Sequence, residues 1–218
     1  SSDLTDMKRI SLIVPCLNEE EAIPAFKQEI DRVFKECLEG YAPELIFVDD
    51  GSTDRSLEMI KKMAEHSPEV KFISFSRNFG KEAAIYAGLE AATGDYAAVM
   101  DVDLQDPPSL LPDMLKAIEK EGYDCAGTRR VTRQGEPLLR SFFARVFYKT
   151  IHQISDTRIV DGARDYKLMT RPVLEALLSL KEYNRFSKGL YEWVGFRTKW
   201  FEYENVERVA GETKIGRA

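Results

Sequence analysis

Short apolar runs alternate with longer segments of helical periodicity through the first half of the chain. The apolar runs predict strands at residues 10–15, 45–48, 70–75 and 96–100. Apolar positions at helical spacing predict helices at residues 19–38, 53–66, 81–92 and 108–121. Strands separated by helices of this length are typical of a parallel sheet covered by helices, so the sequence predicts an α/β fold.

The second half of the chain is less regular. Helical periodicity is found at residues 138–154 and 172–180, a strand is expected at residues 164–169, and residues 200–209 are expected to add one or two strands. Because no linker, repeat or Ser/Gly-rich break interrupts the chain, we expect residues 1–218 to form a single domain.

Composition narrows the functional classes. The 218 residues carry a formal net charge of −6, which makes nucleic acid an unexpected partner. The 3 cysteines lie far apart in the sequence, so a small secreted scaffold held by disulfides is not expected. The 2 histidines are too few for a His-rich zinc site. No secretory signal opens the chain, and its apolar runs are far shorter than the ~18 residues of a membrane span. The chain ends without a closing helix, which suggests a truncated form.

Polar residues follow each of the four predicted strands of the first half. These segments are residues 15–20, 49–54, 76–81 and 101–106. Any one of them is explained as a helix cap or a turn. In parallel α/β sheets, however, ligands bind at the carboxyl ends of the strands. Four polar strand ends along one edge therefore predict a binding site.

Asp101 and Asp103 carry the most specific chemistry. In an extended segment, residues two apart point the same way, about 6–7 Å from each other. A slight turn after the strand would bring both carboxylates to one hard cation, and Gln105 continues the series with a carbonyl oxygen. Mg²⁺ and Mn²⁺ take one or two carboxylates and complete their shell with water and substrate phosphates. The pattern therefore predicts a Mg²⁺ or Mn²⁺ site.

Several common signatures are absent from the chain. It contains no GxGxxG, no GxxxxGK[ST] and no GxSxG, so the usual dinucleotide, P-loop and serine hydrolase motifs are missing. A nucleotide held by carboxylates and a metal ion fits the motifs that remain.

Taken together, the motifs resemble family 2 glycosyltransferases with the GT-A fold. The stretches that carry this resemblance are SLIVPCLNEE, IFVDDGSTD, SRNFGKEAAIYAGLEAATGD and VMDVDLQDPP. CAGTRRVTRQGE, DGARDYKLM and ERVAGETK are similar to the polyprenyl-phosphate branch, which includes dolichyl-phosphate mannose synthases and bacterial bactoprenol glucosyltransferases. The resemblance spans residues 10–214. It implies a Rossmann-like, mostly parallel sheet flanked by helices on both faces.

The resemblance also implies inverting transfer of a sugar from a nucleotide donor to a lipid phosphate. It divides the domain into a nucleotide-sugar half, about residues 8–125, and an acceptor half, about residues 126–214. In the first half, the residues implied to bind nucleotide, diphosphate or metal are Pro15, Leu17, Glu19, Asp49 or Asp50, Lys81, Asp101, Asp103 and Gln105. UDP-glucose or UDP-N-acetylglucosamine is the favoured donor, and GDP-mannose is also compatible.

In the acceptor half, the resemblance assigns three arginines to phosphate groups: Arg129, Arg140 and Arg208. Lys214 lies in a match to the family's GESK motif, and Asp165 matches the aspartate of its DFRL motif. The third residue of that motif is lysine here, and lysine lacks the bidentate geometry of arginine, so Lys167 is given no catalytic role. Because a phosphate acceptor is already anionic, Asp165 is expected to orient groups rather than to act as an obligatory base.

An apolar stripe with basic neighbours at residues 140–154 is explained equally well by a membrane-surface helix and by a core helix. Family relatives often carry transmembrane helices after the GESK-like motif, so the full-length protein is expected at the cytoplasmic face of the cell membrane. Two alternatives stay open. One is a family 2 glycosyltransferase with a soluble glycan or protein acceptor, and the other is a non-catalytic nucleotide-sugar binding module.

Overall fold

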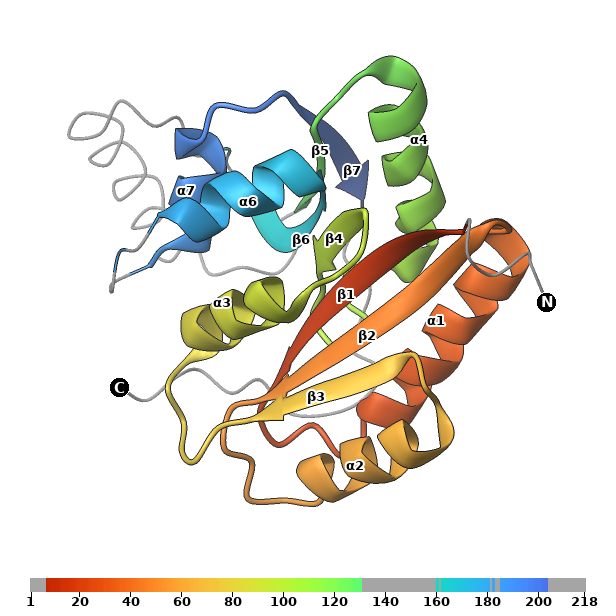
Figure 1. The fold of residues 1–218 in the computed structure, drawn as a ribbon, viewed down its shortest axis with the longest axis vertical. Coiled ribbons are helices and arrows are strands. Elements are labelled where there is room, and N and C mark those ends of the chain that lie inside the picture. Colours follow the sequence, from red (N-terminus) through yellow and green to blue (C-terminus); the bar gives the residue numbers. More distant parts are fainter. Residues whose placement is uncertain (1–6, 131–159, 161, 181, 183–184, 204–218) are drawn as a thin grey trace, which may run out of the picture.

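A seven-stranded sheet organises the described part of the protein (Figure 1). The computed structural model describes residues 7–130, 160, 162–180, 182 and 185–203. The strands are β1 (Lys8–Cys16), β2 (Tyr41–Asp49), β3 (Val70–Ser74), β4 (Tyr96–Val99), β5 (Cys125–Arg130), β6 (Ala163–Thr170) and β7 (Thr198–Tyr203). The helices are α1 (Ile23–Cys37), α2 (Ser56–His66), α3 (Lys81–Ala91), α4 (Leu111–Glu121), α6 (Arg171–Ser179) and α7 (Ser187–Trp193), with a 3₁₀ turn at Pro108–Leu110.

The strand order is β3-β2-β1-β4-β6-β5-β7. β1 runs parallel to β2 and β4, and β2 runs parallel to β3. β6 lies antiparallel between β4 and β5, and β7 pairs parallel with β5. The expectation of a mostly parallel α/β sheet is therefore confirmed, with β6 as the antiparallel strand.

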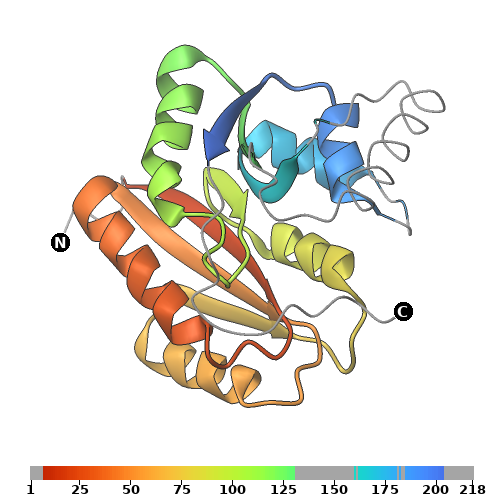
Figure 2. The ribbon, with the colours of Figure 1, turned by 180° about the vertical axis from the view of Figure 1, so that it is seen from behind.

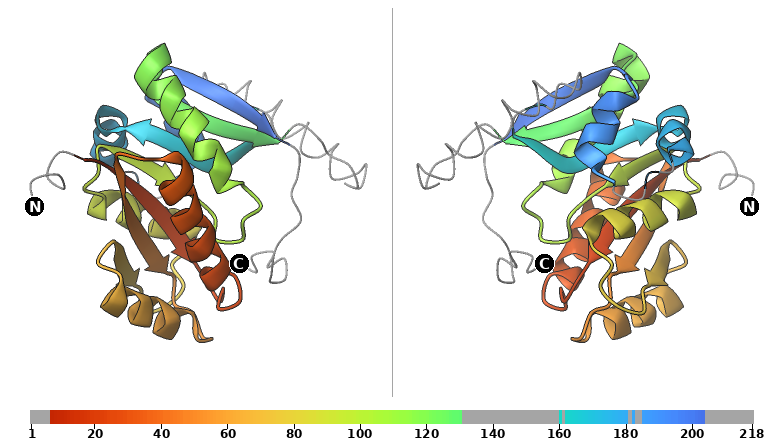
Figure 3. Two further views of the ribbon diagram at one scale, coloured as in Figure 1. Left: turned by 90° about the vertical axis from the view of Figure 1, so that its right-hand side faces the viewer. Right: turned by 90° about the vertical axis from the view of Figure 1, so that its left-hand side faces the viewer.

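Helices cover both faces of this sheet, as expected (Figures 2 and 3). Successive residues of a strand point to opposite faces, so Leu12 contributes to one core and Ile13 to the other. The first core packs against α1, α2 and α4 and includes the edge-to-face pair Phe26 and Phe47. The second packs against α3, α6 and α7. Cys16 and Cys125 are buried in these cores, whereas Cys37 is exposed at the end of α1.

Some element boundaries differ from the sequence-based predictions. α1 begins at Ile23, later than predicted, because Asn18 has a left-handed φ of 55° and a turn follows in which the Ala22 amide donates to Glu19 O at 3.0 Å. β5 and α7 were not expected from the sequence. The predicted helix at residues 138–154 lies outside the described residues. No helix within the described ranges is long and apolar enough to cross a membrane.

A buried carboxylate links β1, β2, β3 and the turn before β4, at the sheet edge away from the strand ends singled out above. Glu44 is 2% exposed and accepts hydrogen bonds from Ser11 Oγ, from Thr93 N at 2.9 Å and from Thr93 Oγ1 at 2.6 Å. Lys71 Nζ lies 2.5 Å from Glu44 Oε1. Burial alone would raise the pKa of Glu44, but these partners lower it to about 2.

We expect Glu44→Gln to lower the free energy of unfolding by about 1–3 kcal/mol at pH 7, because buried donors lose a charged acceptor. The folded-state pKa of about 2 lies below the ordinary 4.5. The charge of Glu44 therefore stabilises the fold above about pH 5, and this contribution is lost as the pH falls through 4.5 towards 2. Urea unfolding of both proteins between pH 3 and pH 7 measures the difference.

Glu58→Gln is the matched control. Glu58 forms an exposed ion pair with Lys62 one turn along α2, and solvent screening leaves such pairs with little effect on stability. If the two variants lose equal stability, or if the effect of Glu44→Gln does not shrink in acid, the assignment of a stabilising charge to Glu44 is wrong.

Candidate active site

The carboxyl ends of β1 to β5 and the amino end of β6 share one edge of the sheet, which we call the rim. β1 and β4 are parallel, with Ile13 opposite Val99. Because β6 is antiparallel to β4, with Lys167 opposite Val99, its first residues reach the same edge. β5 is antiparallel to β6, and Arg129 lies opposite Ala163. The topology therefore brings residues from both predicted halves to the rim.

The central contact of the rim is made by Lys81, the first residue of α3. Its Nζ atom lies 2.6 Å from Asp101 Oδ1 and 2.5 Å from Asp165 Oδ2. Lys188, on α7, lies 3.6 Å from Asp165 Oδ1. Two aspartates and two lysines from β6, α3, α7 and the segment after β4 thus form one charged cluster.

The positive charges of Lys81 and Lys188 keep Asp165 ionised. Burial of the Asp165 carboxyl would raise its pKa, but the ammonium groups of Lys81 and Lys188 overcome that effect and hold the pKa below its ordinary value. Its carboxylate is therefore an electrostatic anchor for cations at neutral pH and a weak proton acceptor.

The segment after β4 turns sharply. Leu104 has a left-handed φ of 57°, and Asp103 Oδ1 accepts a hydrogen bond from the Gln105 amide at 3.1 Å. Asp103 is 6% exposed. Asp106, 1% exposed, accepts from Arg164 Nε at 3.1 Å and from the Tyr203 hydroxyl. Asp106 therefore joins this segment to β6 and β7.

Asp101, Asp103 and Gln105 fit a hard divalent cation by the chemistry of their oxygen atoms. In the ranges that the structure describes, no group of three or more His, Cys, Asp or Glu side chains could hold a metal ion. Asp101, Asp103 and Gln105 instead match the common mode in which one or two carboxylates and the phosphates of a substrate share the ion.

Two neighbouring aspartates at the end of β2 have different surroundings. Asp50 accepts hydrogen bonds from Phe79 N at 2.6 Å and Gly80 N at 2.9 Å, so both of its oxygens hold the loop before α3. Asp49 accepts longer bonds, at 3.3 Å from Ser52 N and at 3.4 Å from Ser74 Oγ.

Gly51 allows these two loops to approach each other. It has a φ of +76°, and a Cβ atom there would lie 2.5 Å from the carbonyl carbon of Arg77. A side chain at this position would push the two loops apart.

The end of β1 lies beside these loops. The three residues predicted there, Pro15, Leu17 and Glu19, are each half-buried. Asn18 fixes the next loop, since its Oδ1 accepts from Thr53 N at 2.7 Å. Burial raises the pKa of the Cys16 thiol, and the carboxylates of Glu19, Asp49, Asp101 and Asp54 raise it further. This part of the rim is therefore strongly acidic and suits a cation.

Arg129 reaches the rim from β5, where its guanidinium pairs with Glu202 on β7. The other cations predicted for the acceptor half, Arg140, Arg208 and Lys214, lie outside the described residues. Sequence reasoning assigned no individual role to Lys188, Arg164 or Asp106. Arg164 lies within DGARDYKLM and Asp106 within VMDVDLQDPP, so both belong to motifs that were singled out, whereas Lys188 lies in a segment without a motif.

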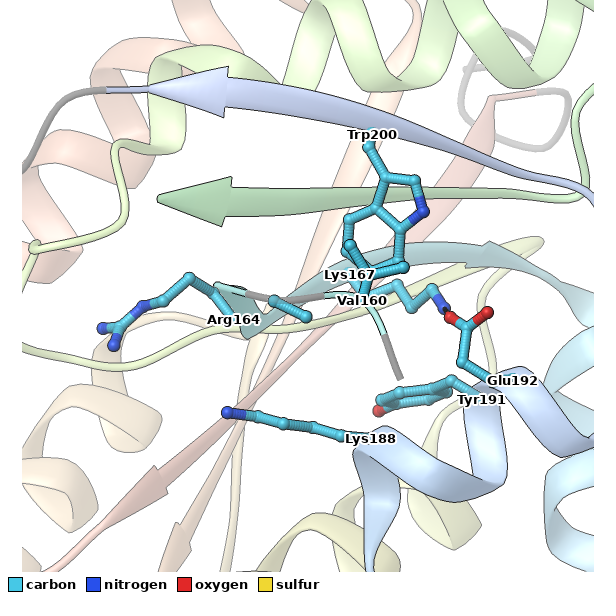
Figure 4. Close-up of a pocket in the computed structure, with 8 residues that line it drawn as sticks. Val160, Arg164, Lys167, Lys188, Tyr191, Glu192 and Trp200 are labelled. Atoms are coloured by element: carbon cyan, nitrogen blue, oxygen red, sulfur yellow. Dashed lines mark hydrogen bonds and ion pairs between the residues drawn. The ribbon is translucent and has the colours of Figure 1, made fainter. Parts of the chain in front are cut away.

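Lys167 lies in a small cavity next to the cluster (Figure 4). It is 2% exposed, and its Nζ atom lies 4.7 Å from the Tyr191 ring centre, 5.2 Å from the Trp200 ring centre and 3.5 Å from Glu192 Oε1. Burial lowers the pKa of its ammonium. These contacts join β6 to α7 and β7.

Comparison with known sequences identifies relatives of this chain. Residues 11–178 match the sequence model of Glycosyl transferase family 2. CsbB of Bacillus subtilis, provisionally named a glycosyltransferase, is 44% identical over 94% of this chain and 61% of its own length. A prophage bactoprenol glucosyl transferase homolog of Escherichia coli is 42% identical over 95% of this chain and 67% of its own length. The chain thus spans about three fifths to two thirds of these relatives.

Solved structures are similar in fold. A mannosyltransferase from Pyrobaculum calidifontis, in complex with GDP-mannose and Mn²⁺, has a TM-score of 0.62 at 20% identity, covering 98% of this chain and 60% of that one. Glucosyl-3-phosphoglycerate synthase from Mycobacterium tuberculosis has a TM-score of 0.62 at 19% identity, covering 94% and 73%. The fold is the GT-A fold that the motif resemblance implied. Because the family model matches most of the sequence, this chain belongs to glycosyltransferase family 2.

Proposed function

We propose that this chain transfers a sugar from a nucleotide-diphosphate donor to a polyprenyl phosphate, with inversion at the anomeric carbon. The observation that carries the proposal is the meeting of Asp101 and Asp165 around Lys81 at the rim. It joins the candidate donor half to the candidate acceptor half. A relative named as a bactoprenol glucosyl transferase, 42% identical over 95% of this chain, supports the lipid acceptor and glucose as the sugar.

On the donor side, Asp101, Asp103 and Gln105 would hold Mg²⁺ or Mn²⁺ together with the diphosphate. When bound, the ion would supply neutralising charge to the leaving diphosphate. We assign the base or ribose to Asp49, because the hydrogen bonds that it accepts, at 3.3 Å from Ser52 N and 3.4 Å from Ser74 Oγ, are longer than those that hold Asp50 to the loop before α3. Pro15, Leu17 and Glu19, at the end of β1, would line the nucleotide pocket, and Lys214 would face phosphate.

On the acceptor side, the nucleophile is a phosphate oxygen that is anionic at neutral pH and needs little deprotonation. Catalysis then depends on positioning and on charge. Asp165 would orient Lys81 and Lys188, and the arginines 129, 140 and 208 would bind the acceptor phosphate. Because that phosphate is the headgroup of a membrane lipid, the domain would work at the cytoplasmic face of the cell membrane.

The test of this proposal is a transfer assay with radiolabelled UDP-glucose, UDP-N-acetylglucosamine and GDP-mannose, with and without Mn²⁺. Label that enters the organic phase only when undecaprenyl phosphate is present supports the proposal. Label that stays in water on a soluble glycan or protein supports the first alternative. Donor binding in calorimetry without transfer or donor hydrolysis supports a binding module.

We expect Asp103→Ala to abolish metal-dependent donor binding, because one carboxylate cannot anchor the cation against the charge of the diphosphate. Calorimetry with UDP-sugar and Mn²⁺ measures the loss. Asp103→Asn, which keeps an oxygen for the Gln105 amide, should lose binding equally. Asp113→Ala, an exposed aspartate in the first turn of α4, should bind like wild type. Undiminished binding in the Asp103 variants would remove this residue from the metal site.

Asp49→Ala and Asp50→Ala are expected to differ. Asp49→Ala should weaken UDP binding about tenfold, through the loss of a charge-assisted hydrogen bond, and should lower the free energy of unfolding less than Asp50→Ala does, because the hydrogen bonds that Asp49 accepts are longer. Asp50→Ala should lower the free energy of unfolding by about 1–3 kcal/mol, because the Phe79 and Gly80 amides lose their acceptor. Calorimetry and urea unfolding on both variants measure the two effects, and the reverse pattern would exchange the two assignments.

Asp165→Asn should lower kcat about 10- to 100-fold by misplacing the lysines around it. The acidic limb of the pH profile of kcat should keep its position, since the acceptor phosphate sets it. A general base at Asp165 would predict instead that the acidic limb disappears from the variant's profile. Asp113→Asn, on the exposed face of α4, serves as the control with wild-type kinetics.

A further inference from the structure

Lys81 forms an ion pair with the same Asp101 carboxylate that the proposed metal site would use. Its Nζ atom lies 2.6 Å from Asp101 Oδ1, at the distance of a close ion pair. A divalent cation bound to the same carboxylate would lie within a few ångströms of the ammonium charge. Like charges at such a separation repel strongly, because little solvent screens them at close range. The ammonium and the metal ion therefore compete for Asp101.

Asp165 gives Lys81 a second partner. The same Nζ atom lies 2.5 Å from Asp165 Oδ2, so the ammonium keeps one carboxylate when it releases the other. The Lys81 side chain is 42% exposed, and those of Asp101 and Asp165 are 23% and 19% exposed. The exchange therefore needs no opening of the core, and the cost of releasing Asp101 is limited to one contact.

We propose that Lys81 stays ion-paired with Asp101 in the donor-free protein. This ion pair keeps the affinity of the site for a divalent metal ion low until the nucleotide diphosphate binds. This inference rests on the proposed function, because it takes Asp101 as a metal ligand. The diphosphate supplies the negative charge that both cations need, so metal and donor bind together. Metal bound without a donor is thereby disfavoured.

The experiment measures Mn²⁺ binding to the full chain by electron paramagnetic resonance, first without nucleotide and then with saturating UDP. Lys81→Met removes the ammonium and should bind Mn²⁺ without nucleotide about tenfold tighter or more. Lys81→Gln, with a polar side chain, should do the same. Lys81→Arg keeps the charge and should bind like wild type. Thermal unfolding of each variant verifies that it is folded.

Lys188→Met is the matched control. Lys188 pairs with Asp165, at 3.6 Å, on the oxygen that Lys81 does not contact. Its loss should leave nucleotide-free Mn²⁺ affinity within about twofold of wild type, because charge effects weaken with distance. In the double variant Lys81→Met/Asp101→Asn, the gain should vanish, which assigns the tighter Mn²⁺ to Asp101.

Failure of the inference about Lys81 and failure of the proposed metal site give different results. If wild type binds Mn²⁺ with UDP but Lys81→Met and Lys81→Gln gain no affinity without it, the inference is wrong and the proposed metal site stands. If neither wild type nor any variant binds Mn²⁺ with UDP, the proposed metal site is wrong and the inference falls with it. An equal gain in Lys188→Met would also overturn the inference, since it would show a general charge effect.

Discussion

The antiparallel position of β6 between β4 and β5 is the constraint on which the rim depends. A strand parallel to β4 would carry its first residues to the far edge of the sheet, and Asp165 would lie a strand length away from Asp101. With β6 reversed, residue 165 enters the sheet where β4 leaves it. The same reversal lets β5 run parallel to β4 again and return Arg129 to that edge.

The charges at the rim are arranged around this junction. Carboxylates from the ends of β1, β2 and β4 make one side acidic, and the Cys16 thiol, buried among them, has a raised pKa. Asp165 on the other side is surrounded by Lys81 and Lys188. Among the residues that the structure describes, Lys81 contacts a carboxylate on each side, because its ammonium group pairs with both Asp101 and Asp165.

Much of the first half of the chain could be predicted from the sequence, because its strands are uninterrupted apolar runs and its helices have regular periodicity. β5 could not, since Gly127 and two arginines give it a weak strand pattern and its place depends on pairing with β6 and β7 on either side. Gly127 is needed there because a Cβ atom would lie 2.9 Å from the Trp200 ring.

The candidate site was predictable only in part. Residues 101–106 and 49–54 follow strands, so their position at the rim follows from local pattern. Lys188 has no such signal, because α7 reaches Asp165 through tertiary packing: the Ser187 amide donates to Glu82 at 3.0 Å, and Lys167 packs against Tyr191. The direction of β6 is likewise a long-range property.

The different burial of the three cysteines has a practical consequence for chemical labelling. Thiolates are the species that react with maleimides, and burial with a raised pKa suppresses them at Cys16 and Cys125. Cys37 is exposed at the end of α1, close to where β2 begins and therefore at the sheet edge opposite the rim. The sequence thus offers one accessible thiol, to which a fluorophore or spin label can be attached away from the rim.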